Sequence, residues 1–398
     1  MNISTATARI HGLDTLRALA IVLVFMSHYA SFVSGEPTFG FLGEVGWSGV
    51  DLFFALSGYL IGNQILAALR GPERLSLGRF YARRLLRTLP NFYVVLALYA
   101  CWPYFRGASV MPELWRFLSF TQNLGLNPGT AFSHAWSLCV EEQFYMLLPA
   151  LALLIAARRR ALPLAWLLVF GSLLAGMLIR SYVWHNYIDG NERDIYRYYN
   201  LVYYSTLCRF DELVAGVALA LVKNHHAALW QRLTAYGNWM LAAGAALLGL
   251  AWYLFLLDRY GYAATVFGYP LLAVAISLLL LAALSPGALL HRLRVPGAAA
   301  LALWSYAIYL SHKQLCVLLG KVLAAQGLAP TGWPAVSLLS LASVAAGWLL
   351  YSLVERPFMV LRQRWVPHHF VREQGDGSRP ARRGWSSLWS SPSSPSSR

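Results

Sequence analysis

Charged residues and cysteines are both scarce in this chain. Only 12% of its 398 residues are charged, which is about half the share found in ordinary globular proteins. The four cysteines are widely spaced and form no CxxC pair, a pattern that argues against a disulfide framework or a metal site. Acidic residues are fewer than basic ones, with 17 Asp and Glu against 32 Lys and Arg. The composition is not that of a soluble globular domain, and we expect no metal.

Long apolar runs make up much of the chain. Hydrophobic residues make up 58% of the chain, its mean hydropathy is +0.50, and stretches of membrane-spanning length recur from end to end. The sequence therefore predicts an all-α polytopic membrane protein with about ten transmembrane helices. The expected spans are 14–33, 48–69, 88–105, 137–157, 161–179, 207–222, 238–257, 263–284, 300–322 and 334–354.

Lysine and arginine are unevenly shared among the segments that connect these runs. Residues 70–87 hold six arginines and Arg158–Arg160 follow the fourth run, whereas 34–46 and 323–333 hold neither Lys nor Arg. Because cytoplasmic loops carry the excess of Lys and Arg, this bias predicts that both termini are cytoplasmic. The net charge of +15 then indicates contact with anionic membrane lipid, not with nucleic acid. We expect a multi-pass protein of the plasma membrane.

Two parts of the chain differ from the apolar runs. We expect a membrane domain over residues 1–364, followed at 365–398 by a disordered, basic, cytoplasmic tail rich in Ser, Pro and Arg. Residues 180–204 are polar and rich in tyrosine. They suit an ordered cap over a cavity, and they suit equally an interfacial aromatic belt with a solvated loop.

The first apolar run carries ionisable residues on one helix face. Arg17 and His28 are eleven residues apart, so at about 100° per residue their side chains point within roughly 20° of each other. They are separated by roughly 16 Å along the axis, and Asp14 falls near the same face. Ionisable residues inside a membrane span are costly, and they mark a functional site by default.

Further polar patches lie in or beside other predicted spans. They are 49–58 with Asp51; the arginines Arg79, Arg83, Arg84 and Arg87; 134–145 with His134, Trp136, Glu141 and Glu142; and 305–312 with Tyr306, Tyr309 and His312. The predicted topology puts His28 and the three carboxylates in the outer half of the membrane, and it puts Arg17 and the arginine run at the inner face. We therefore expect a cytoplasmic cationic mouth joined to a buried site of histidine and carboxylates.

These residue types suit a phosphate-bearing donor that enters from the cytosol and a hydroxyl acceptor that meets it further out. A neutral imidazole accepts a proton from a hydroxyl near neutral pH, and a carboxylate beside it fixes its tautomer. Arginine clusters bind phosphates. Each patch also has a structural interpretation. In that interpretation His28 forms a buried hydrogen bond, Asp51 caps a helix, and the arginine run marks the cytoplasmic side of the membrane. Glu141 and Glu142 suit an ion pair, and the tyrosines suit core packing.

The motifs resemble acyltransferase family 3, integral membrane proteins that acylate hydroxyls on surface glycans and some antibiotics. The matching segments are Leu13-Asp14-Thr15-Leu16-Arg17 with His28, Gly49–Phe54 with Ser57-Gly58, Trp136–Leu138 with Glu141–Phe144, Tyr309 with His312, and Glu355–Phe358. The resemblance implies a ten-helix fold and an acyl-coenzyme A donor. It also implies that His28 is the catalytic histidine supported by Arg17, and that Arg84 and Arg87, or Arg83, bind the donor.

The sequence thus predicts a membrane O-acyltransferase, specifically an O-acetyltransferase. We expect His28, Glu142 and Arg17 to be catalytic and Arg83, Arg84 and Arg87 to bind acyl-coenzyme A, with Glu142 or else Asp51 orienting His28. The expected acceptor-binding residues are Asp51, His134, Trp136, Glu141 and His312.

Several alternatives stay open at this point. Direct transfer and an acyl-histidine relay are equally compatible with the residues. A proton-coupled transporter also has buried charges and a histidine within the membrane, and a non-catalytic scaffold is a third possibility. Some relatives carry an extracytoplasmic hydrolase-like domain, so a partner protein is an alternative to unaided transfer. The acceptor hydroxyl (polysaccharide, lipopolysaccharide or other), the acyl chain length and the oligomeric state are left open.

Overall fold

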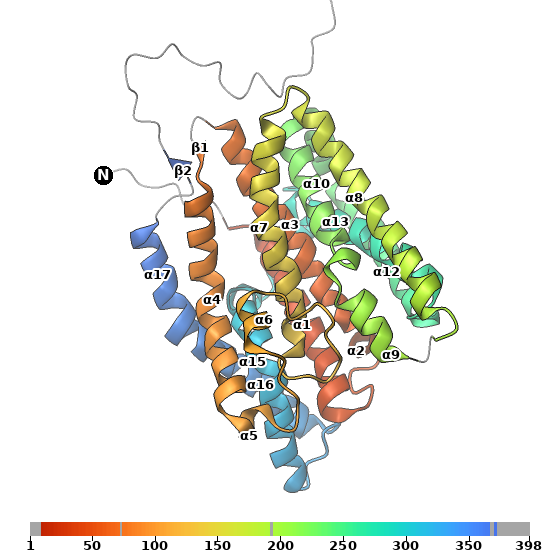
Figure 1. Cartoon of the computed structure of the whole chain (residues 1–398), viewed down its shortest axis with the longest axis vertical. Helices are drawn as coiled ribbons and strands as arrows, with labels where there is room; N and C mark the ends of the chain where they lie inside the picture. The colour runs from red at the N-terminus through yellow and green to blue at the C-terminus, as the bar shows by residue number, and fades with distance from the viewer. Residues whose placement is uncertain (1–8, 72–73, 192–193, 367–369, 372–398) are drawn as a thin grey trace, which may run out of the picture.

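The computed structural model describes residues 9–71, 74–191, 194–366 and 370–371, and this part of the chain is almost entirely helical (Figure 1). The α-helices are α1 (His11–Tyr29), α2 (Phe41–Val45), α3 (Gly49–Arg70), α4 (Leu77–Cys101), α5 (Pro103–Arg106), α6 (Leu114–Leu118), α7 (Trp136–Ala156), α8 (Ala161–Val183), α9 (Ile195–Tyr198), α10 (Asp211–His225), α11 (Ala227–Ala235), α12 (Gly237–Leu257), α13 (Tyr269–Leu284), α14 (Leu289–Arg292), α15 (Ala298–Ala325), α16 (Trp333–Leu350) and α17 (Arg356–Trp365).

Shorter helical segments and one small strand pair complete the described chain. Turns of π-helix cover Ala30–Ser34, Trp184–Ile188, Tyr199–Tyr203, Ala264–Gly268 and Tyr351–Glu355, and 3-10 turns cover Gly46–Ser48, Ser133–Ala135 and Thr206–Cys208. The strands β1 (Arg74–Leu75) and β2 (Phe370–Val371) pair antiparallel. The start of the expected tail therefore includes the end of α17 and β2, and residues 372–398 of that tail lie outside the described residues.

Helix is the form that apolar sequence takes in a bilayer, because it satisfies every backbone donor and acceptor within one segment. Local signals set several of the starts. The Ser76 hydroxyl accepts a hydrogen bond from the Arg79 amide at the start of α4, and Pro334 occupies the first turn of α16, where its missing N–H costs nothing.

Within the described residues, seven helical segments are long and apolar enough to cross a membrane, or eight if the bent pair α10–α11 is one span. They are His11–Ser34, Phe41–Arg70, Ser133–Ala156, Ala161–Ile188, Gly237–Leu257, Ala264–Leu284 and Trp333–Trp365. Several apolar helices of this length indicate a multi-pass membrane protein. The all-α class is confirmed, whereas the count of ten and the cytoplasmic termini stay predictions.

The three expected spans outside that set are helical but more polar or shorter. The expected span 88–105 lies mostly in α4, which begins eleven residues earlier and so includes the arginine run that we expected in a loop. The expected span 207–222 overlaps α10, which has 15 residues before a bend of 111° into α11. The expected span 300–322 lies in α15, where the polar stretch Ser305–Gln314 lowers the hydropathy.

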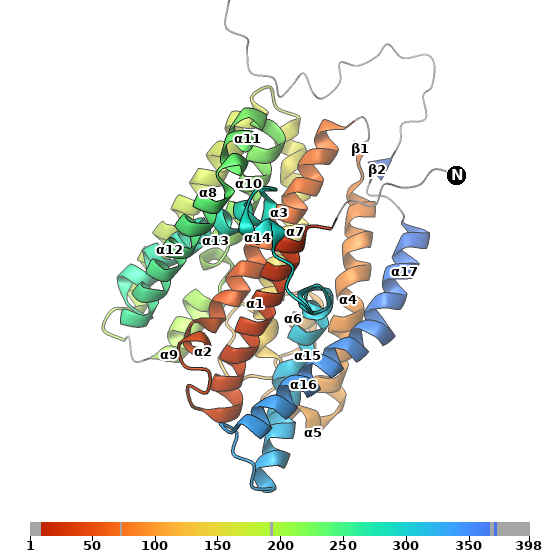
Figure 2. The ribbon, with the colours of Figure 1, turned by 180° about the vertical axis from the view of Figure 1, so that it is seen from behind.

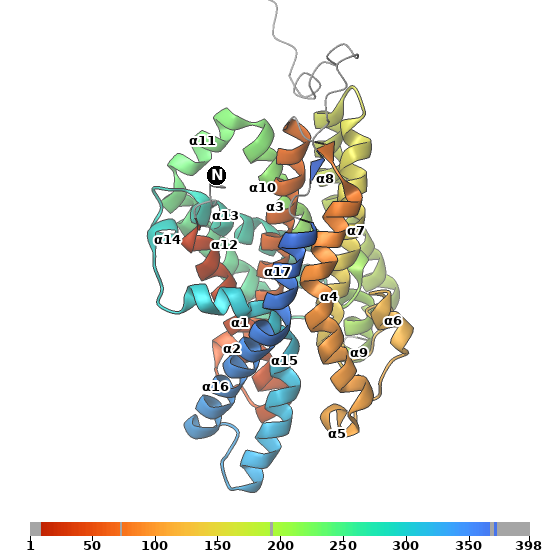
Figure 3. The ribbon, with the colours of Figure 1, turned by 90° about the vertical axis from the view of Figure 1, so that its left-hand side faces the viewer.

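The two ends of the helical bundle differ in charge. In Figure 1 the β1–β2 pair, the end of α3 at Arg70 and the α7–α8 turn with Arg158–Arg160 lie at the upper end. The loop around α2 and the α15–α16 turn, which lack Lys and Arg, lie at the lower end. Figure 2, from behind, shows α1 and α15 near the middle of the molecule, and Figure 3 shows α17 alongside α4.

Candidate active site

A polar cavity of about 240 Å³ lies between α1, α3, α4, α7 and α15. Its wall includes five of the site residues expected from the sequence, namely Arg17, Arg84, Arg87, Glu141 and Glu142. These residues come from three different helices, α1, α4 and α7. The structure therefore assembles a charged pocket from segments that are far apart in the chain.

Arg84 joins α4 to the two carboxylates of α7. Its guanidinium lies 3.7 Å from Glu141 and 3.4 Å from Glu142 and stacks on the Tyr145 ring at 3.7 Å. Glu141 also accepts hydrogen bonds of 3.1 Å from Ser57 and Tyr145. The ion-pair interpretation of Glu141 and Glu142 is thus the one that the structure supports, with Arg84 as the basic partner.

Arg17 and Arg87 face the same cavity, and a third carboxylate, that of Glu355, lines its wall with them. Both are half-buried, and neither forms an ion pair with any residue that the structure describes. Arg87 still attracts Glu355 and Glu142 at longer range, so the wall carries charges of both signs, and its arginines can turn to an anion without breaking a close ion pair. Arg83 is absent from the cavity wall, and it donates a hydrogen bond to the Val366 carbonyl.

Three histidines gather beside this cavity. His28 on α1 lies 2.9 Å from His312 on α15, measured from Nδ1 to Nε2, and the two rings are nearly parallel at 5° with centroids 5.0 Å apart. The His312 Nδ1 lies 2.8 Å from the Ile308 carbonyl oxygen. The ring of His134, from the 3-10 turn before α7, lies 6.0 Å from that of His28, and its Nε2 is 3.2 Å from the Leu310 carbonyl oxygen.

Tyr309 connects the cavity with the histidine cluster. It lines the cavity, and its ring centroid lies 6.5 Å from that of His28. Its hydroxyl donates to the His134 carbonyl at 2.6 Å, so it accepts the 2.7 Å hydrogen bond from Ser137. Tyr309 therefore lies between the charged cavity and the three histidines.

The carboxylates do not approach His28 as the sequence led us to expect. Glu142 is held by Arg84, and Asp51 forms a fully buried ion pair with Arg209. No hydrogen bond between His28 and an acidic side chain is present among the described residues. The nitrogen next to His28 belongs instead to His312.

Arg209 is not among the site residues expected from the sequence, although an arginine inside an expected span is itself a signal. Its guanidinium lies over the rings of Trp136, Tyr203 and Tyr269 at 5.1, 4.5 and 4.5 Å. Trp136 packs further against Tyr204, so the polar stretch 180–204 ends in ordered structure on α7. Trp136 and Asp51 therefore belong to one buried cation site, apart from His28.

Lys313 is a second residue that sequence reasoning missed. It follows His312 on α15, is 8% exposed, and donates to the Ser133 hydroxyl at 3.2 Å. Its ammonium lies 3.8 Å from the ring centroid of Phe32, and Phe32 in turn lies beside His28. A positive charge therefore lies close to the histidine cluster.

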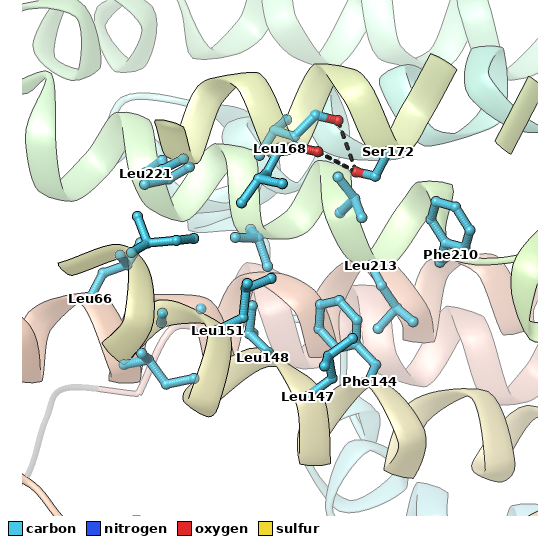
Figure 4. Close-up of a pocket in the computed structure, with 18 of the residues that line it drawn as sticks. Leu66, Phe144, Leu147, Leu148, Leu151, Leu168, Ser172, Phe210, Leu213 and Leu221 are labelled. Atoms are coloured by element: carbon cyan, nitrogen blue, oxygen red, sulfur yellow. Dashed lines mark hydrogen bonds between the residues drawn. The ribbon is translucent and has the colours of Figure 1, made fainter. Parts of the chain in front are cut away.

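A larger apolar pocket of about 440 Å³ lies on the opposite face of α7 (Figure 4). Leucines and phenylalanines from α3, α7, α8 and α10 dominate its wall. The polar side chains there bond within the protein, since Ser172 donates to the Leu168 carbonyl at 2.7 Å and Thr206 to Gln143 at 2.7 Å. This pocket offers no group for transfer chemistry.

Comparison with known proteins shows which proteins this chain is similar to. Residues 10–352 match the acyltransferase domain of acyltransferase family 3. The peptidoglycan O-acetyltransferase OatA of Listeria monocytogenes is 30% identical over 229 residues, 53% of this chain and 33% of the relative. The O-acetyltransferase OatA of Staphylococcus aureus is 27% identical over 230 residues, 53% and 34% of the two chains. The chain thus spans about a third of the length of these relatives, and no solved structure matches it.

The buried pair of Asp51 and Arg209 yields a stability prediction. Asp51→Leu strands a buried guanidinium, and loss of one partner of a buried pair costs about 3–5 kcal/mol. The double variant Asp51→Leu with Arg209→Met removes both charges, so we expect it to be more stable than Asp51→Leu alone. Apparent melting temperatures of the detergent-purified variants test this order. A single variant that melts like the unmodified protein would contradict it.

Proposed function

Because the chain belongs to acyltransferase family 3, we propose that it is a membrane O-acetyltransferase. It moves an acetyl group from acetyl-coenzyme A to a hydroxyl of a surface glycan. The observation that carries the proposal is the cavity lined by Arg17, Arg84 and Arg87, which adjoins a histidine cluster across Tyr309. The names of the relatives make peptidoglycan the first acceptor to test.

Orientation in the membrane is part of the proposal. Ten helices cross the bilayer, with both termini and the arginine-rich end of the bundle in the cytoplasm, and residues 1–364 form the membrane domain. The shared position of the arginine-rich segments supports this orientation. Coenzyme A then approaches from the cytoplasmic side, and the glycan approaches from the other.

The arginines at and near the cavity have different roles in donor binding. Arg17 and Arg87 hold its phosphates, because both line the cavity and neither forms a close ion pair among the described residues. Arg84 keeps Glu141 and Glu142 in place, so it shapes the wall of the cavity. Arg83, which contacts the segment after α17, supports the mouth from outside.

The transfer step needs one base and one leaving group. His28 takes the proton of the acceptor hydroxyl, and the oxygen attacks the carbonyl carbon of the thioester. The carbon–sulfur bond breaks, and the thiolate of coenzyme A receives the proton from His28. The positive charge of Lys313, close to the cluster, favours the negative oxygen of the tetrahedral intermediate.

Loss of His28 tests the proposed chemistry. We expect His28→Ala to lower acetyl transfer by about 10²–10⁴-fold, the usual contribution of a general base. Purified protein with radiolabelled acetyl-coenzyme A and peptidoglycan fragments gives the measurement. His185→Ala is the matched control, since His185 is exposed and lies outside the cluster. Near-normal turnover by His28→Ala protein would contradict the role of His28, and vesicle uptake of unmodified solute would instead indicate a transporter.

Loss of Arg87 tests the donor site. We expect Arg87→Ala to weaken coenzyme A binding by about 1.5–3 kcal/mol, the value of a hydrogen bond to a charged group. Titration calorimetry measures the affinity, and Arg159→Ala serves as the control because Arg159 is an exposed arginine away from the cavity. Equal losses in both variants would indicate a general charge effect and not a donor site.

A further inference from the structure

The neighbour of His28 is an imidazole where hydrolases and transferases commonly use a carboxylate. We propose that His312 is a positioning residue that holds His28 in the tautomer with a proton on Nδ1 and a free lone pair on Nε2. The inference rests on the proposed function, because it names what prepares His28 to act as the base. It changes the role that the sequence led us to expect for His312, which was binding of the acceptor.

The hydrogen-bond chain sets the positions of the protons. A carbonyl oxygen only accepts hydrogen bonds, so the His312 Nδ1, 2.8 Å from the Ile308 oxygen, carries a proton. In neutral His312 the Nε2 then has a lone pair and accepts. The His28 Nδ1, 2.9 Å from that nitrogen, must donate. The remaining nitrogen of His28, Nε2, is therefore left without a proton and is available to take one.

The surroundings favour a neutral His312. Its side chain is 1% exposed, and the buried ammonium of Lys313 lies on the next residue. A second positive charge on His312 would be buried beside the first, which is unfavourable at low dielectric. No described carboxylate bonds to either ring, so none compensates such a charge. The neutral form, with an acceptor Nε2, is the one that these contacts stabilise.

The arrangement orients the base without passing its proton onward. The His312 Nδ1 proton is held by the Ile308 carbonyl, which cannot be protonated in its place. A proton that His28 takes at Nε2 therefore stays on His28 until the leaving thiolate receives it. The nearly parallel rings are carried by α1 and α15, which pack against each other, so two helices fix the direction of the acceptor nitrogen.

Three variants at one position separate positioning from packing. His312→Leu fills the space but offers no acceptor, so we expect kcat to fall by about 10²–10⁴-fold, as when a catalytic histidine loses its tautomer, with KM for acetyl-coenzyme A unchanged. His312→Gln offers an acceptor oxygen near the position of Nε2, and we expect it to restore at least tenfold over His312→Leu. His185→Gln is the control for loss of a histidine elsewhere. Equal activity of His312→Leu and unmodified protein, or no recovery in His312→Gln, would overturn the proposal.

Nitrogen NMR tests the tautomer independently of activity. In full-length protein with ¹⁵N-labelled histidine in lipid nanodiscs, the signals of His28 are those lost in His28→Ala. We expect a protonated Nδ1 and an unprotonated Nε2, and we expect His312→Leu to shift the proton toward Nε2. A proton on Nε2 in the unmodified protein overturns the inference even if transfer is normal. The expected tautomer in a protein that transfers no acetyl group supports the hydrogen-bond assignment and refutes the proposed function instead.

Discussion

The contact of Arg84 with the carboxylates of α7 is the constraint on which the charged pocket depends. It ties α4 to α7 across the cavity, and its positive charge lies between the carboxylates of Glu141 and Glu142. Without it, two acidic side chains would face the same small space and repel each other. The contact exists because α4 begins at Leu77 and carries its arginines into the helical bundle, not in a loop.

Two fully buried ion pairs account for four of the charged side chains inside the helical bundle. Asp51 and Arg209 neutralise each other, as do Arg180 and Asp211 in a bidentate pair of 2.5 and 3.0 Å. Arg17 and Arg87 form no close ion pair among the described residues and lie on one side of Tyr309, and the histidines lie on the other. In the proposed function, the first side binds the phosphate-bearing donor and the second carries out the chemistry on the hydroxyl.

Features that depend on local sequence could be predicted well. Apolar periodicity and length located the helices, and the motifs around Arg17, Arg84 and Glu141 supplied five residues that line one cavity. Pairings across long stretches of chain could not be predicted in this way. Asp51 and Arg209 are 158 residues apart, and His28 and His312 are 284 residues apart. A single sequence shows that a carboxylate is buried, but the cation that satisfies it depends on how the helices pack.

The side of the membrane from which the donor binds tests the central claim most directly. In the proposed function, the donor mouth and the base are separated along the membrane normal. In sealed inverted vesicles, radiolabelled acetyl-coenzyme A added outside should acetylate a peptidoglycan fragment trapped in the lumen. In right-side-out vesicles the same donor should label no acceptor until detergent opens the membrane. Equal labelling from the outer face of sealed right-side-out vesicles would contradict a cytoplasmic donor site built around Arg17 and Arg87.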